Sequence, residues 1–191
     1  MEPLLLVLLL VLAAVAVGLW LSWTATRLDR MHHRIDVARA SLEAQLLRRS
    51  GAALELAVTD RLDPPSRLVL LDAAHGARSS GPDTFEAAES ALSQALRAVL
   101  DDPGHVAGLR ADPEVGPLVE ELARDCATVE LARRFHNDVV VSARGLRSRR
   151  RVRWLRLAGR AAPPRSVDLD DVPPAVLVDG SAYSSWPPPE T

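Results

Sequence analysis

The run from Leu4 to Trp23, LLLVLLLVLAAVAVGLWLSW, constrains the fold more than any other feature, because it holds twenty residues without a charge. As a helix these residues rise about 30 Å, which matches the thickness of the hydrocarbon core of a bilayer. Trp20 and Trp23 stand at one end of the run, where aromatic rings favour the membrane interface. We predict a transmembrane helix over residues 4–25, after a short N-terminal end at residues 1–3.

A cleaved signal peptide is the competing interpretation of this run. A signal peptide needs a basic segment before its apolar core, and here only the α-amino group and Glu2 precede it. A cut after Ala25 would also place Trp23 at a position that favours a small residue. We therefore favour an uncleaved anchor.

The charges on the two sides of the span predict its orientation. No basic side chain precedes the span, whereas Arg27, Arg30, Arg34 and Arg39 follow it. Because cytoplasmic flanks carry the excess of basic residues, we expect the N-terminus outside and the chain from about residue 27 onward in the cytoplasm of a bacterial cell. All 23 basic residues are arginine, which suggests a high-GC genome. The residues expected at this interface are Trp20, Trp23, Arg27 and Arg30.

The sequence pattern of residues 26–160 predicts a helical bundle. Steps of three and four residues separate apolar positions in three long stretches, which is the period of a helix face. Proline-containing and glycine-containing breaks at 62–66, 79–83 and 101–104 divide these stretches. We expect helices to about residue 62, over 66–78, from 83 or 84 to 100 and from 112 to about 148, with one turn near 105–111. The stripe residues are Leu28, Met31, Ile35, Ala38, Leu42, Leu46, Ala53, Leu54, Ala57, Val58, Phe85, Ala88, Leu92, Leu96, Val99, Leu118, Leu122, Cys126, Val129, Ala132, His136, Val139, Ala143 and Leu146.

The predicted fold class is all-α, an N-terminal transmembrane helix that continues into an antiparallel up-and-down bundle with long first and last helices. Short connections make successive helices antiparallel. The end of the last helix should therefore return beside the start of the first, at the bilayer. Residues 161–191 hold half of the fourteen prolines and several acidic residues, and we predict that this tail is disordered.

The segment RSRRRVRWLRLAGR at 147–160 combines seven arginines with apolar residues and contains no acid. At the membrane-facing end of the last helix it would contact anionic lipid headgroups. Solvated arginines on the bundle are the alternative. Nucleic acid is disfavoured, because there is one short patch and the chain carries a net charge of −2. The interface residues predicted here are Arg150, Arg151, Arg153, Trp154 and Arg156.

Two stretches resemble signatures of the LemA family. TRLDRMHHRIDVARASLEAQLLRR resembles the family's opening, in which a membrane helix leads to a QLxRR segment, and VELARRFHNDVV resembles an ARRxYN run on the last long helix. The turn that follows the double arginine in that family is missing, so the chain would be a divergent, actinobacterial relative. The resemblance implies a membrane-attached helical bundle and supplies no mechanism. The signature positions are Gln45, Arg48, Arg49, Arg133, Arg134, His136 and Asn137.

Several single residues have a structural and a functional interpretation. Cys126 lies on an apolar stripe, so we expect a buried thiol. His136 and Asn137 are expected to form a hydrogen-bonded structural pair, with ligand or partner contact as the alternative. His32 and His33 are expected in solvent rather than on a metal, because no third ligand is near. Arg48 and Arg49 point about 100° apart on a helix, so at most one can face the interior, and we expect solvated ion pairs.

No nucleotide-binding, hydrolase or metal motif stands in the sequence. We therefore expect no enzymatic activity and no cofactor, and a scaffold or interaction module whose partners are the bilayer and a protein or a second copy. Two alternatives stay open. One is a membrane-tethered ligand sensor or hydrolase that uses the His136 and Asn137 region. The other is a signalling adaptor that recruits a partner through its tail.

Overall fold

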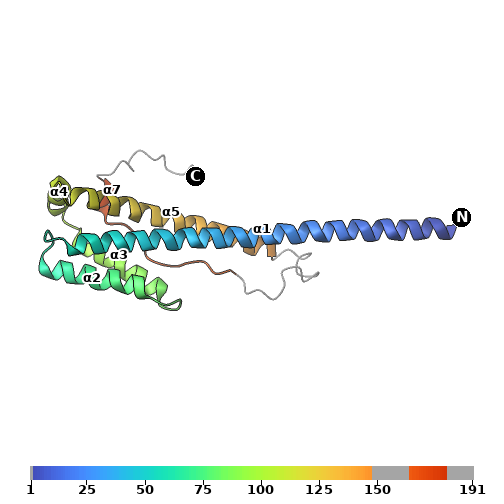
Figure 1. The fold of residues 1–191 in the computed structure, drawn as a ribbon, viewed down its shortest axis with the longest axis horizontal. Helices are drawn as coiled ribbons and strands as arrows, with labels where there is room; N and C mark the ends of the chain where they lie inside the picture. The colour runs from blue at the N-terminus through green and yellow to red at the C-terminus, as the bar shows by residue number, and fades with distance from the viewer. Residues whose placement is uncertain (1, 148–163, 180–191) are drawn as a thin grey trace. The chain divides into compact units, whose positions relative to one another are not determined.

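The computed structural model describes residues 2–147 and 164–179, and all regular secondary structure in these ranges is helical (Figure 1). The prediction of an all-α chain is confirmed for this part. The chain divides into two compact units, which we describe separately. One consists of Met1–Ala38 and Asp138–Ser166, and the other of Arg39–Asn137 and Val167–Thr191.

Helix α1 spans Glu2–Val58 without a break and contains the apolar run. The prediction that the apolar run and the following amphipathic stretch form one continuous helix is confirmed. Within it, Pro3–Trp20 is long and apolar enough to cross a membrane, and none of this window is buried in the protein. Gly51 interrupts the stripe of larger residues but does not break the helix, as expected for a glycine that costs about 1 kcal/mol.

Three Asp-Pro pairs mark the starts of later helices. Asp63 precedes α2 (Pro64–Ser79) and accepts a hydrogen bond from the backbone N–H of Ser66 at 3.2 Å. Asp102 precedes α4 (Pro103–Ala111) and accepts two such bonds, and Asp112 accepts two from the turn that leads into α5 (Gly116–Arg147). An aspartate cap satisfies orphan N–H groups while the following proline has none to satisfy. The single turn expected near 105–111 is a helix of nine residues.

Helix α3 (Phe85–Val99) follows α2 after a short connection, and the two helices pack side by side (Figure 1). Its predicted stripe holds, since Leu92 and Leu96 are buried while Phe85 and Val99 lie half-buried against the same cores. One stripe assignment on α1 was wrong. Val58 is 68% exposed, because it is the last residue of the helix and the chain turns away there towards α2.

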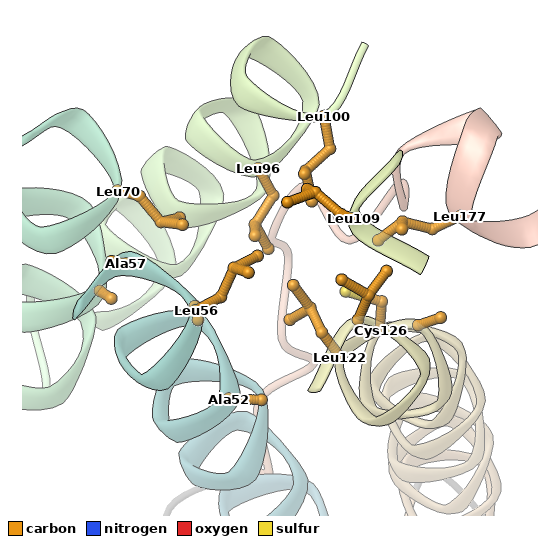
Figure 2. Packing of buried hydrophobic residues seen from close by; sticks show 14 of the residues in the cluster. Ala52, Leu56, Ala57, Leu70, Leu96, Leu100, Leu109, Leu122, Cys126 and Leu177 are labelled. Carbon is orange, nitrogen blue, oxygen red and sulfur yellow. The ribbon is translucent and has the colours of Figure 1, made fainter. Parts of the chain in front are cut away.

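The main core of the second unit draws residues from α1, α2, α3, α4, α5 and a short C-terminal helix (Figure 2). Alanine and leucine supply most of its buried side chains. The fully buried members include Leu56, Leu70, Leu100, Leu122 and Leu177. A second, smaller cluster joins Leu42 and Leu46 of α1 to Val129 of α5 and to Leu169.

The prediction of a disordered tail was wrong for residues 164–179. Residues 164–174 form an extended segment, and Ala175–Asp179 form helix α7, which packs against α4 (Figure 1). Leu169 and Leu177 are buried in the two cores, so the few apolar residues of this proline-rich segment suffice to hold it once polar contacts supplement them. Residues 161–163 and 180–191 of the predicted tail lie outside the described residues.

Candidate interaction site

The most elaborate polar arrangement in the second unit surrounds residues 167–179, which we call the strap. The strap begins VDLDDV and ends in α7. Side chains of α3, α4 and α5 hold both its backbone and its acidic side chains. The contact residues on α3 and on α5 are spaced four or seven positions apart, so those of each helix share one face.

Asn137 of α5 clamps the backbone at the start of the strap. Its Nδ2 donates to the carbonyl oxygen of Val167 at 2.9 Å, and its Oδ1 accepts the N–H of the same residue at 2.9 Å. A side-chain amide used in this way matches the donor and acceptor of one residue in an extended chain, as a neighbouring strand would. Asn137 is therefore hydrogen-bonded within the fold, and its partner is Val167 of the strap.

Two bidentate arginine–aspartate ion pairs, which we call forks, hold the next part of the strap. Arg97 of α3 donates to both carboxylate oxygens of Asp170, at 3.0 and 2.5 Å, and also to the carbonyl oxygen of Val172 at 2.7 Å. Arg133 of α5 donates to both carboxylate oxygens of Asp171, at 2.5 and 3.0 Å. Bidentate pairs of this kind combine charge with fixed orientation. The hydrogen bond from Arg97 lowers the pKa of Asp170 below its ordinary value.

Further contacts from α3 hold the backbone before the forks and at the first of them. The N–H of Asp168 donates to Oε1 of Glu86 at 3.1 Å, and the N–H of Asp170 donates to Oγ of Ser90 at 3.0 Å. Leu169, which lies between them, inserts into the cluster of Leu42, Leu46 and Val129. The strap thus alternates between polar contacts to the helices and one apolar insertion.

Arg110 of α4 holds the far end of the strap. Its Nη1 and Nη2 donate to the carbonyl oxygens of Val176 and Leu177, at 3.3 and 2.8 Å. Its guanidinium also forms an ion pair with Glu120, with Nε 2.9 Å from Oε1. Leu177 itself is 0% exposed, in the main core.

A buried ion pair stands inside the same unit. Arg49 of α1 is 1% exposed and donates to Oε2 of Glu89 at 2.7 Å and to Oγ of Ser93 at 2.9 Å. Burial raises the pKa of the Glu89 carboxyl, while the charge of Arg49 opposes that rise. The expectation that one of two adjacent arginines at most faces the interior is confirmed, because Arg48 is exposed. The expectation of a solvated ion pair was wrong for Arg49, since its charge is met by a carboxylate on α3 that has no recognisable spacing to it in the sequence.

The other family-signature positions divide between the strap and the surface. Gln45 is half-buried, and Arg134 pairs with Glu130 one turn earlier on the exposed side of α5. His136 is 2% exposed, as its place on the stripe predicted. Arg133 and Asn137 hold the strap. The two signatures thus contribute to separate features, the internal ion pair and the strap.

The predicted membrane-interface residues lie partly within the described chain. Trp20, Trp23 and Arg30 are exposed on α1, and Arg27 lies on the same helix. The second group, Arg150, Arg151, Arg153, Trp154 and Arg156, lies outside the described residues.

Cys126 is buried in the main core, as predicted, and burial raises the pKa of its thiol to about 11. His33 is exposed and His32 half-exposed on α1. In the described ranges no group of three or more His, Cys, Asp or Glu side chains is placed to hold a metal ion.

Sequence reasoning missed Arg97, Asp170 and Asp171, which are central to the strap. The available signal was the alternation of apolar and acidic residues in VDLDDV, which has the period of an extended chain with two distinct faces. The proline content of the surrounding tail outweighed that signal.

Comparison of the chain with protein-family models, with curated proteins and with solved structures gave no match.

Proposed function

We propose that this chain is a single-pass bacterial membrane protein whose helical body lies in the cytoplasm and acts as a scaffold or interaction module. The observation that carries the proposal is the window Pro3–Trp20 of α1, whose apolar side chains bury nothing within the protein. Exposed leucine and valine over such a length are stable only in an apolar surrounding. The four arginines after the span support the orientation with the N-terminus outside.

An antiparallel up-and-down arrangement and a LemA-like ancestry belong to the same proposal. The grouping of Met1–Ala38 with Asp138–Ser166 into one compact unit supports the return of the last long helix towards the start of the first. The structural use of Arg49, Arg133 and Asn137 supports the view that the signature positions maintain a fold rather than a reaction centre. Anionic headgroups as ligands of residues 147–160 remain part of the proposal on the strength of the sequence.

The enzyme or sensor alternative rests on His136 and Asn137. Because Asn137 uses both ends of its amide on Val167, and His136 lies in the interior, these residues favour a scaffold. The strap supports the adaptor alternative, because side chains of α3 and α5 make specific contacts with this part of the tail.

The membrane assignment and orientation can be tested with introduced cysteines. Cys126 is buried and should not react in the folded chain, so the background is Cys126→Ala. Leu68→Cys places a thiol at a position that is 67% exposed on α2, and Glu2→Cys places one before the span. In intact cells an impermeant maleimide should label Glu2→Cys and spare Leu68→Cys, and lysis should expose Leu68→Cys. Labelling of Leu68→Cys from outside would contradict the proposed orientation. Recovery of the chain in the soluble fraction would contradict the proposed membrane anchor.

A further inference from the structure

The strap is held as a bound peptide would be held, because side chains of α3 and α5 contact both the backbone and the acidic side chains of its extended part. Asn137, Glu86 and Ser90 satisfy backbone groups at three positions of the strap. Main-chain contacts of this kind supply affinity for any extended segment, while pockets for alternate side chains supply sequence preference.

The side-chain preferences of the surface under the strap can be read directly. The site that Leu169 fills is formed by apolar side chains of α1 and α5, so it favours an apolar residue at this position of the ligand. Arg97 and Arg133 select carboxylates at the next two positions. The ligand pattern is therefore an extended segment in which an apolar residue is followed by two acidic ones.

The two forks differ in burial, which indicates where the strap can open. Arg97 and Asp170 have side chains that are 32% and 29% exposed, so water screens this pair and its contribution is modest. Asp171 is more enclosed, at 7%. A competing carboxylate can therefore approach Arg97 first, while α7 keeps the end of the strap in place through Leu177.

We propose that the surface formed by Arg97, Arg133, Asn137 and the Leu169 site is a docking groove for an acidic extended peptide of a partner protein, and that the strap occupies it as a resident competitor. The proposal names the partner chemistry of the interaction module proposed above and rests on that function. The strap belongs to the same chain as the groove, so its effective concentration is in the millimolar range, and a partner must exceed that competition to bind. The default state of the groove is therefore closed.

The test uses the full chain in detergent and a labelled peptide of residues 164–179, PRSVDLDDVPPAVLVD. Asp170→Asn with Asp171→Asn weakens the resident strap without altering the groove. This variant should bind the peptide saturably and at least ten-fold more tightly than the wild type does. A second peptide, with asparagine in place of Asp170 and Asp171, should bind this variant at least ten-fold more weakly than the first peptide does. Adding Arg97→Ala and Arg133→Ala to the variant should remove binding. If the folded variant binds neither peptide, or both equally, the proposal is overturned.

A second measurement covers the case in which that variant fails to fold. Val172, 60% exposed on the strap, is replaced by cysteine in the Cys126→Ala background and carries an environment-sensitive dye. The acidic peptide should change the emission saturably and the asparagine peptide should not, whereas an unchanged signal up to millimolar peptide overturns the proposal. Energy transfer between two differently labelled full chains would indicate that a second copy of this chain occupies the groove. That result would overturn the proposal of a separate partner protein. These assays contain no membrane, so their failure is distinct from failure of the cysteine topology test.

Discussion

Arg49 and Glu89 illustrate how a helical interior accommodates charge. Removing either partner would leave the other buried without compensation, which is far more costly than the pair itself. Ser93 adds a second acceptor for the guanidinium, and the backbone carbonyl of Glu89 adds a third at 3.2 Å. The arrangement fixes the register of α1 against α3 by requiring three groups to meet.

The raised pKa of Glu89 predicts a pH dependence with a definite sign. A carboxyl whose pKa is higher in the folded than in the unfolded chain binds more protons when folded, so its contribution to stability falls as pH rises from its ordinary pKa, about 4.3, to its raised value. Glu89→Gln removes this titration. The free energy of unfolding of the wild type minus that of Glu89→Gln should therefore decrease between pH 4 and 7.5, measured by denaturant titration in detergent.

The matched control for this profile is Glu55→Gln, at an exposed position on α1. A difference that rises with pH for Glu89→Gln would show that the charge of Arg49, rather than burial, dominates that site.

At the scale of elements, the start of α5 depends on a glycine for reasons of space. A Cβ at Gly116 would lie 2.5 Å from the carbonyl oxygen of Arg110, a backbone atom that cannot move without shifting α4. Gly116→Ala should therefore lower the free energy of unfolding by about 1–3 kcal/mol. Gly76 lies in α2 with nothing within 4 Å of its added Cβ, so Gly76→Ala should instead raise stability by up to about 1 kcal/mol. Thermal unfolding followed by circular dichroism measures both, and a neutral Gly116→Ala would contradict the close approach.

Helix α7 is short, and Leu177 is its fully buried side chain. Leu177→Ala should leave a cavity in the main core and lower the free energy of unfolding by about 2–5 kcal/mol, measured by denaturant titration. Val172→Ala removes a mostly exposed side chain from the same strap and should change stability by less than about 0.5 kcal/mol. Equal effects of the two changes would mean that α7 contributes no core contact in solution.

Over the whole molecule, the sequence predicted the helices more accurately than it predicted their partners. Periodic stripes and Asp-Pro starts are local signals, so α1, α3 and α5 could be located from neighbouring residues alone. The strap could not, because Asp170 and Asp171 are recognised by arginines more than thirty residues away. A proline-rich, acidic composition favours disorder in isolation, and only the partners on α3 and α5 reverse that balance.

Burial of charge was missed for the same reason. A pattern places Arg49 on a helix, but whether it lies in solvent depends on a carboxylate forty positions later. Predictions that concern one helix face therefore succeeded except at Val58, where the helix ends. Predictions about polar residues required knowledge of which helices meet.

The cluster that contains Leu42 and Leu169 brings together positions 127 residues apart, which has a consequence for the kinetics of folding. Closing so long a loop before the helices have paired would cost entropy without compensating contacts, so the strap should dock after the rate-limiting barrier. Substitutions there should then act almost wholly on one limb of the chevron. We expect Leu169→Ala to accelerate unfolding while leaving the refolding rate nearly unchanged in stopped-flow experiments, and slowed refolding would instead place strap docking in the transition state.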